Sequence, residues 1–414
     1  MNKIYNWFIR RRMYIYLSTL LLLIFTQLIT ITVVAQMWKF EKIFKLLRYL
    51  CYFVLAFLAC ESFYRKVLHN SLKGMIRKTL VFFKEHILLL LFILASFTSM
   101  LVSKEMIPLI LLLLIVNASE YDFDETLHLI IILNVIVFLL TVLGGYFGFL
   151  PDVIITRGDT IRHSYGYIYP TEFLSHYCFI VLMYIYLKKD QFGIKDFFLS
   201  NIFNFIFFKM SDSRLDFLII LFATGLGLLF SCRPGVLKKI AKSIYVNGIL
   251  LFSILISFIS SVFYNGNSSL FSKLNQLLSQ RLLLGNNALS YYGLKMFGQK
   301  IEWIGSGGSG IYRTFDQIDY NYVDCSYLQY ALSFGIVFML VMILLYMLAI
   351  KHEYLENRNY SLFIFAVIFV ISIIEPRLLN IQMNPFILLL GSIIMLSNKE
   401  ILKLIKGERK NGTV

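Results

Sequence analysis

The sequence predicts an all-α integral membrane protein, a polytopic bundle of about twelve transmembrane helices. Of its 414 residues, 58% are hydrophobic and only 15% are charged. A water-soluble domain carries about a quarter charged residues to cover its surface. The apolar residues here come in blocks of about 15 to 25, the length that crosses a hydrocarbon core as a helix. Because a water-soluble fold cannot bury so many blocks, we expect them to lie in a bilayer.

The predicted spans follow from these blocks in chain order. They are Tyr14–Gln36, Leu46–Phe63, His86–Val102, Ile107–Ala118, Leu127–Phe149, Ile168–Leu187, Phe197–Phe208, Leu215–Phe230, Ser243–Phe263, Tyr327–Ile350, Ser361–Ile374 and Asn384–Leu396. The spans that begin at Ile107, Phe197 and Asn384 are close to the lower limit of length. The first block is too long for the core of a signal peptide, so we expect it to remain as an anchor.

Basic residues between the blocks predict the orientation. The positive-inside rule places the N-terminus, with Arg10–Arg12, in the cytoplasm, together with residues 65–84, residues 233–242 and the tail after Lys399. Both termini are then cytoplasmic in a multi-pass protein of the cell membrane. One basic segment, Trp38–Arg48, falls outside against the rule, which an interfacial helix or a misplaced first pair of spans would explain. The net charge of +15 reflects topology rather than nucleic-acid binding, because no soluble face gathers the basic residues.

We expect one membrane domain, residues 1–414, with one long extracytoplasmic loop, residues 264–326. This loop is far longer than a plain connection and contains two helical stretches, Leu270–Leu284 and Leu289–Phe297, followed by a glycine-rich run. The run lacks the lysine and hydroxyl residue of a nucleotide-binding loop, so it is interpreted as a hinge. The five cysteines and six histidines show no ligand spacing, and no metal, cofactor or disulfide is predicted.

Arginines collect in the predicted outer segments, and they are the candidate ligands of a phosphate group. They are Arg157, Arg162, Arg214, Arg281, Arg313 and Arg377. Arginine presents a planar fork that binds phosphate through two hydrogen bonds. An anionic headgroup joined to a lipid tail would match such a surface above an apolar body.

Each outer cluster also has a local interpretation. Glu172 and His176 lie four positions apart at the head of a span, where they either face a cavity or only fix the end of the helix. In residues 211–216, Asp212 and Asp216 either neutralise Arg214 and cap the following helix or leave Arg214 to point into the same cavity. The segment 375–377 offers a similar internal pair of a glutamate and an arginine, beside a helix-breaking proline.

Three motifs resemble those of a known enzyme family. They are Arg162–His163–Ser164–Tyr165–Gly166–Tyr167 followed by Tyr169–Pro170–Thr171; Ser211–Asp212–Ser213–Arg214; and Ile304–Gly305–Ser306–Gly307 followed by Val323–Asp324–Cys325–Ser326–Tyr327–Leu328 and Gly335. They resemble the R-x-S-L-G-F-x-x-P-N, T/S-x-S-R and G-x-G … D-x-x-Y-L-x-x-L-x-x-x-G patterns of capsular and exopolysaccharide polymerases of the Wzy type. The chain length, the predicted spans and the single dominant loop also fit that family. Tyr165, Tyr167 and Thr171 depart from its pattern.

The resemblance implies a reaction between two undecaprenyl-diphosphate-linked oligosaccharides on the outer face of the membrane. A hydroxyl of one repeat unit attacks the anomeric carbon of a chain on a second carrier, and lipid diphosphate leaves. The resemblance further implies that Arg162 and Arg214, with Arg157 and Arg313, stabilise the charge that builds on the diphosphate.

The same reaction needs a base that accepts the proton of the attacking hydroxyl. The candidates, in order, are Asp324, His163 and Glu172. The implied partners are the lipid bilayer, a flippase and a chain-length regulator of the same pathway. Two other functions stay open, an O-antigen-ligase-like transferase with a different acceptor and a flippase or transporter of the lipid-linked unit. The scarcity of charge deep in the spans and the one-sided long loop disfavour the transporter.

Overall fold

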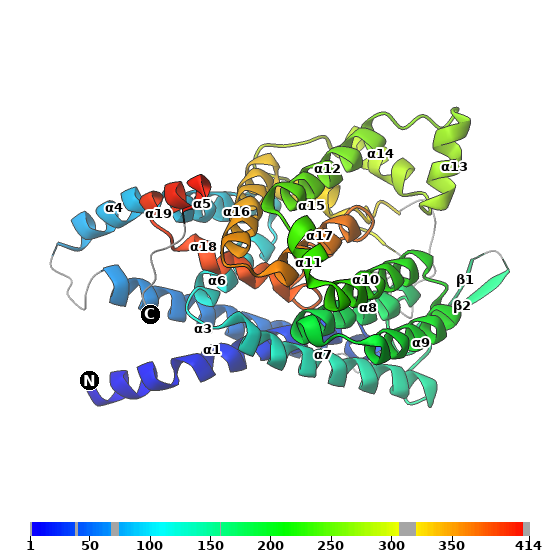
Figure 1. Ribbon diagram of the computed structural model, residues 1–414, viewed down its shortest axis with the longest axis horizontal. Helices are drawn as coiled ribbons and strands as arrows, with labels where there is room; N and C mark the ends of the chain where they lie inside the picture. Colours follow the sequence, from blue (N-terminus) through cyan, green and yellow to red (C-terminus); the bar gives the residue numbers. More distant parts are fainter. Residues whose placement is uncertain (1, 38–39, 68–73, 158, 306–319, 409–414) are drawn as a thin grey trace.

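Helices make up most of the molecule. The computed structural model describes residues 2–37, 40–67, 74–157, 159–305 and 320–408. Its helices are α1 (Asn2–Thr30), α2 (Val33–Met37), α3 (Glu41–Val67), α4 (Met75–Glu85), α5 (Ile87–Ser103), α6 (Ile107–Ala118), α7 (Phe123–Tyr146), α8 (Pro170–Lys188), η1 (Lys189–Gln191), α9 (Ile194–Ser211), α10 (Arg214–Cys232), α11 (Pro234–Ile240), α12 (Ser243–Val262), α13 (Ser269–Leu277), α14 (Arg281–Tyr292), α15 (Ser326–Phe334), α16 (Ile336–Leu355), α17 (Asn359–Ile371), η3 (Pro385–Leu390), α18 (Gly391–Ile394) and α19 (Asn398–Lys406). A β-hairpin, β1 (Ile154–Arg157) and β2 (Thr160–His163), lies between α7 and α8 (Figure 1).

Six helices of the described chain are long and apolar enough to cross a membrane. They are α1 from Arg11 onward, α3, α7, α10, α12 and α16. Two bent pairs, α4 with α5 and residues 385–394 with α19, raise the number to eight if each pair is one span. This architecture is compatible with an all-α membrane protein.

The expected number of about twelve spans is not confirmed, because several predicted blocks form short helices. The block Ile107–Ala118 is α6, a helix of 12 residues. At 1.5 Å per residue it reaches about 18 Å, well short of a hydrocarbon core of about 30 Å. Helix α17 has 13 residues. The block that begins at Asn384 folds into a 3₁₀ helix and a single α-turn, so it is not one continuous span.

Large apolar side chains cover the outside of the helical body. Phe198, Ile202 and Phe205 on α9 are between 52% and 57% exposed, and Phe222 on α10 and Phe252 on α12 are 64% and 62% exposed. Single exposed apolar residues are normal in soluble proteins, but many large ones on several helices indicate a surface made for an apolar environment. The surface of the bundle therefore agrees with the composition of the chain.

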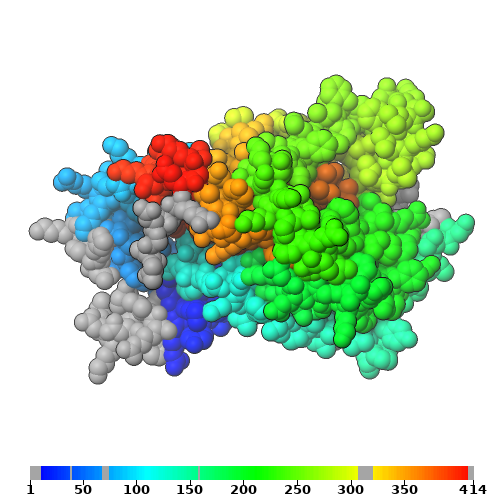
Figure 2. Space-filling model, in the orientation of Figure 1, coloured from blue at the N-terminus to red at the C-terminus, as the bar shows by residue number. Residues whose placement is uncertain are grey.

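The long axis of the molecule separates two ends (Figures 1 and 2). The start of α1, α4 and α19 lie at one end, here called the terminal end. The β-hairpin, α13 and α14 lie at the other, here called the hairpin end. The long loop, residues 264–326, contributes α13 and α14, so its two short helices lie at the same end as the hairpin. The two loops that the sequence marks as informative therefore meet at one end.

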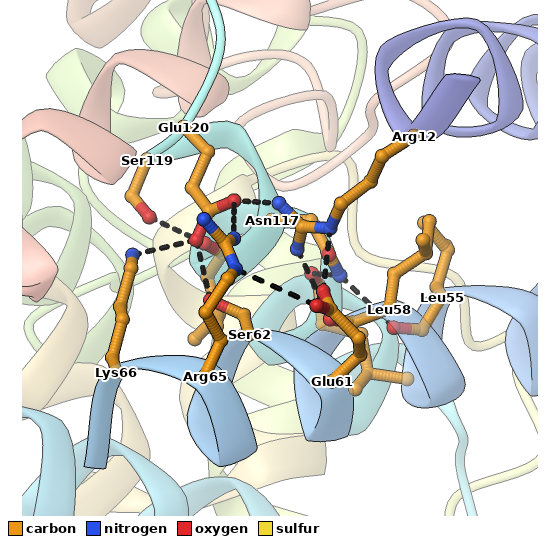
Figure 3. A network of polar contacts seen from close by, with 12 residues as sticks. Arg12, Leu55, Leu58, Glu61, Ser62, Arg65, Lys66, Asn117, Ser119 and Glu120 are labelled. Atoms are coloured by element: carbon orange, nitrogen blue, oxygen red, sulfur yellow. Dashed lines mark hydrogen bonds and ion pairs between the residues drawn. The ribbon is translucent and has the colours of Figure 1, made fainter. Parts of the chain in front are cut away.

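A buried ion network ties α1 to α3 and to the end of α6, as Figure 3 shows. Arg12 pairs with Glu61 at 2.9 Å and also contacts Glu120. Arg65 and Lys66 reach Glu120 at 2.9 and 2.6 Å. Buried charges must be paired because an isolated buried ion costs several kcal/mol. The network therefore fixes the first helix against the third.

The shorter loop, residues 151–167, folds into the β-hairpin, a structure that its sequence did not predict. Asp152 closes the base of the hairpin. Its carboxylate accepts hydrogen bonds from the backbone N–H groups of Ser164 at 2.9 Å and Tyr165 at 2.8 Å, and it contacts the imidazole of His163. One carboxylate thus holds the turn that leads into α8.

The backbone leaves the helical path in residues 372–384, between α17 and η3, inside the body of the molecule. These residues are called the interrupted segment below. Buried side chains of α15 satisfy the carbonyl groups that this interruption frees. The hydroxyl of Tyr330 donates to the carbonyl of Pro376 at 2.7 Å, and that of Ser326 donates to the carbonyl of Glu375 at 2.6 Å. Irregular backbone survives in an apolar body only where the protein supplies such partners. Helix α15 therefore fixes the position of Glu375 and its neighbours.

Two glycines join the long loop to the start of α16. Gly298 and Gly335 have φ values of 89° and 90°. A Cβ atom on Gly335 would lie 2.2 Å from the backbone nitrogen of Gly298. The close approach lets the N–H of Ile336 donate to the carbonyl of Lys295 at 3.0 Å. The two glycines therefore set the path of the chain that follows α14.

We expect Gly335→Ala to lower the free energy of unfolding by about 2 kcal/mol or more, because the new methyl group meets backbone and the residue keeps a left-handed conformation. The matched control is Gly248→Ala on α12, where nothing lies within 4 Å of the added Cβ. The control should keep or slightly raise stability, since alanine favours helix. Thermal unfolding of the purified proteins in detergent measures both, and equal melting temperatures would contradict the packing described.

Candidate functional site

A polar cavity of about 700 Å³ borders the turn from α13 to α14. Both helices lie at the hairpin end (Figure 1). Five separate segments line the cavity: residues 168–172 at the start of α8, residues 276–281 from α13 to α14, residues 303–305, residues 320–324 and residues 375–377. It is called the primary cavity below. The long loop, the chain after the hairpin and the interrupted segment after α17 therefore meet at one place.

Four of the predicted site residues line the primary cavity: Glu172, Arg281, Asp324 and Arg377. Glu172 and Arg377 are 205 positions apart in the sequence, yet the guanidinium group donates directly to the carboxylate. The four were predicted from three segments of the sequence, because Arg281 and Asp324 both belong to the long loop. The structure brings them together.

Arg162 supports the wall of this cavity from behind. It is only 1% exposed, and its Nε donates to the carbonyl of Ser211 at 2.7 Å. Its guanidinium group lies over the ring of Tyr169, 5.6 Å from the centroid, and Tyr169 lines the cavity. Arg162 thus holds an aromatic wall residue in place and joins the hairpin to α9.

The remaining predicted residues lie outside the lining of the primary cavity or outside the described part of the chain. His163 contacts Asp152 at the base of the hairpin. Arg214 has a side chain that is 67% exposed and pairs with Asp212 at 3.2 Å, so the ion pair of the local interpretation is present, whereas Ser213 forms no side-chain cap of α10. The side chain of Arg157 and the whole of Arg313 fall outside the described residues.

Arg281, the first residue of α14, connects the long loop to the interrupted backbone. Its Nε donates to the carbonyl of Ile374 at 2.9 Å. Its Nη2 lies 3.2 Å from Oδ2 of Asp324 and 3.4 Å from Oε1 of Glu375. One side chain therefore joins three segments, from α14, from the chain before α15 and from the chain after α17.

Arg377 forms the second ion cluster of the cavity. It contacts Glu172 in the first turn of α8 and lies 3.8 Å from Oε2 of Glu375. The first turn of a helix favours a negative charge, because its unpaired N–H groups carry partial positive charge. Glu375 thus lies between the two guanidinium groups.

Asp216 belongs to the same cluster, although its sequence position suggested a partner of Arg214. It is 2% exposed, accepts a hydrogen bond from the hydroxyl of Ser213 at 2.6 Å, and interacts electrostatically with Arg281 and Arg377. Helix α10 begins at Arg214. Residues two apart on a helix face different directions. That spacing is the signal that separates an outward arginine from an inward aspartate.

The charges of the site set its proton chemistry. Burial raises the pKa of Asp324 above its usual range, although the charge of Arg281 acts in the opposite direction. Burial also acts to lower the pKa of Arg281, but Asp324 and Glu375 outweigh it, and this pKa lies above its usual value. Arg281 therefore stays charged, while Asp324 can exchange a proton closer to neutral pH.

Aromatic and amide side chains form the rest of the wall. Tyr169, Trp303 and Tyr322 line the cavity, together with Gln276 and Gln280. Burial raises the pKa of Tyr322 to about 12, so its phenol stays protonated and can donate a hydrogen bond. Flat rings and amides suit a ligand with apolar faces and many hydroxyl groups. Tyr169 belongs to one of the sequence motifs quoted above, but none of the five was predicted as a site residue, because no local pattern singles out the other four.

No protein-family model, curated protein or solved structure matches this chain. The fold and the site define a class of protein. It is a helical protein, compatible with an integral membrane protein, with a charged and aromatic cavity between its long loop and the interrupted segment after α17. Such a cavity can bind an anionic group through guanidinium donors and can move a proton through a carboxylate.

We expect Arg377→Gln to lower the free energy of unfolding by about 2 kcal/mol, because it leaves the half-buried Glu172 without its cation. The double variant with Glu172→Gln should recover part of that loss. Lys300→Gln is the matched control, since Lys300 pairs with Glu302 on the exposed surface and should leave stability unchanged. Chemical or thermal unfolding in detergent measures the coupling, and strictly additive effects would argue against the ion pair.

Proposed function

We propose that this protein is a membrane glycosyltransferase that polymerises lipid-diphosphate-linked oligosaccharide repeat units into a surface polysaccharide. The observation that carries the proposal is the meeting of Glu172, Arg281, Asp324 and Arg377 in one cavity. The motif resemblance points to the regions around Glu172 and Asp324. The preference of arginine for phosphate points to the two arginines of the cavity. Aromatic and amide side chains beside them suit the sugar part of such a substrate.

The proposal includes an orientation, with the hairpin end outside and the terminal end in the cytoplasm. Basic residues of α4 and α19 support it. They are Arg77, Lys78, Lys84, Lys399, Lys403 and Lys406, and both helices lie at the terminal end. The positive-inside rule then puts this end on the cytoplasmic side. The primary cavity accordingly opens where lipid-linked units arrive after they have been flipped.

The proposed reaction breaks one bond and forms one. The hydroxyl oxygen at the end of an acceptor unit bonds to the anomeric carbon of the donor chain, and the bond from that carbon to the diphosphate oxygen breaks. Asp324 accepts the hydroxyl proton and returns it to solvent. Arg281 and Arg377 stabilise the negative charge that the leaving lipid diphosphate gains. No nucleotide is needed, because the diphosphate is already a good leaving group.

The resting ion pairs fit this sequence of events. Arg281 contacts Asp324 before substrate is present. When phosphate oxygens of the substrate bind the guanidinium group of Arg281, the positive charge of this group no longer lowers the pKa of Asp324. The released carboxylate is then a better proton acceptor. Binding of the donor therefore prepares the base.

We expect Asp324→Asn and Arg377→Gln to abolish long-chain polysaccharide in a gene-deletion strain complemented with each variant. Single repeat units should remain, because assembly and export precede polymerisation. Lys273→Gln on α13 is the control, since this exposed lysine of the same loop does not line the cavity. Gel electrophoresis of surface and lipid-linked glycans provides the measurement, with immunoblots to match protein levels.

The same gels distinguish the other functions. Full-length polymer bound to the lipid carrier would indicate a ligase-type transferase. Repeat units retained on the cytoplasmic side would indicate a flippase. Normal polymer from both variants would overturn the assignment of the cavity.

We expect the polymerisation rate of the reconstituted protein to fall as pH drops through the raised pKa of Asp324, because only the ionised carboxylate accepts a proton. At donor concentrations well below saturation the free enzyme is titrated, and there Arg281 still faces Asp324. Under that condition Arg281→Gln removes the charge that lowers this pKa, so the acid limb of its residual activity, the fall in rate at low pH, should move to higher pH. Arg281→Lys keeps the charge and should keep the limb in place. An acid limb at the same pH in all three proteins would exclude Asp324 as the base.

A further inference from the structure

Two smaller polar cavities continue from the primary cavity. The bridging cavity has a volume of about 250 Å³ and shares Trp303, Tyr322 and Arg377 with the primary cavity. The distal cavity has a volume of about 310 Å³ and shares Glu105 and Asn380 with the bridging cavity. The three cavities therefore form one series, which runs from α8 and α14 to α1 and α3.

Amide side chains are a common feature of the bridging and distal cavities. They are Gln27, Gln299, Gln329, Asn380 and Gln382. Gln329 and Gln382 are at most 9% exposed. Within the part of the chain that the structure describes, Oε1 of Gln27 and Oδ1 of Asn380 are buried and have no hydrogen-bond partner. Unpaired buried oxygens are costly, and a ligand with hydroxyl donors relieves that cost.

The charges of these two cavities nearly balance. The bridging cavity has Glu105 and Arg377, and the distal cavity has Glu105 and Arg48. A polyanion that filled the series would therefore find no excess of positive charge, although Arg48 can bind a single anionic group at the far end. A sugar chain suits it better, because hydroxyl groups both donate and accept hydrogen bonds and the C–H faces of sugars pack on rings such as Tyr52 and Tyr330.

The two substrates of the proposed reaction present opposite ends to the reacting atoms. The donor brings its diphosphate, which suits the guanidinium groups of the primary cavity. The acceptor brings the sugar farthest from its own lipid, so the rest of its oligosaccharide must extend away from Asp324. The cavities differ in the same way, because the charged primary cavity suits the diphosphate of the donor and the amide-lined cavities suit the sugars of the acceptor.

We propose that the bridging and distal cavities bind the oligosaccharide of the acceptor, with its terminal hydroxyl at Asp324 and its lipid-diphosphate end beside Arg48. This assignment rests on the proposed polymerase function. It also gives a role to a basic residue that the positive-inside rule leaves unexplained. Arg48 lies in the second turn of α3, the helix that forms the far wall of the series.

The experiment measures the binding of two probes to the full-length protein in nanodiscs. One probe is the repeat-unit oligosaccharide, released from its lipid by mild acid, and the other is undecaprenyl diphosphate. We expect Gln27→Leu and Gln382→Leu each to weaken oligosaccharide binding about fivefold and to leave undecaprenyl diphosphate binding at the wild-type level. Arg281→Gln should weaken the binding of undecaprenyl diphosphate and spare that of the oligosaccharide.

Two controls separate binding from folding. Gln27→Leu removes a buried oxygen that has no partner in the described residues, so its melting temperature should stay equal or rise. Asn287→Ala replaces an exposed amide on α14 outside the cavities and should bind both probes as the wild type does. Equal oligosaccharide affinity in the wild type and both glutamine variants would overturn the acceptor site. Failure of the polymerase proposal appears differently, as normal polymer from cells that carry Asp324→Asn.

Discussion

Two guanidinium groups and four carboxylates lie together inside a helical body, and this charge cluster is the constraint on which the site depends. Arg281 holds it together, because its Nε binds the carbonyl of Ile374 while its Nη2 lies 3.2 Å from Asp324 and 3.4 Å from Glu375. A buried ion without a partner costs several kcal/mol, so the long loop cannot leave this position without losing those contacts. The same contacts of Arg281 therefore fix the position of the long loop and balance the charges of the cavity.

The interrupted segment after α17 makes the cluster possible. A continuous helix would hold the backbone groups of residues 372–384 in its own hydrogen bonds and would leave no carbonyl for Arg281. The interruption survives because Ser326 and Tyr330 of α15 donate to the freed carbonyls. The same segment forms part of all three cavities, so a backbone irregularity supports both the charged site and the amide-lined path beside it.

Local sequence was sufficient for some features of the fold and not for others. Apolar composition and block length predict helices, and the structure confirms a helical architecture with six to eight helices able to cross a membrane. The expected number of about twelve spans is not confirmed, since α6 and α17 are as apolar as a span but only 12 and 13 residues long. The β-hairpin was missed, because it depends on Asp152 binding backbone groups more than ten positions away.

The sequence by itself determined the kinds of side chain in the site: one arginine in the long loop, one beside Pro376, and carboxylates in the same and neighbouring segments. Only the tertiary structure decided which of them meet. It turned Arg214 outward and Asp216 inward, placed Arg162 behind Tyr169, and joined Glu172 to Arg377 across 205 positions. The physical reason is that periodicity and composition report on a residue and its near neighbours, whereas an ion cluster forms by the packing of helices that are distant along the chain.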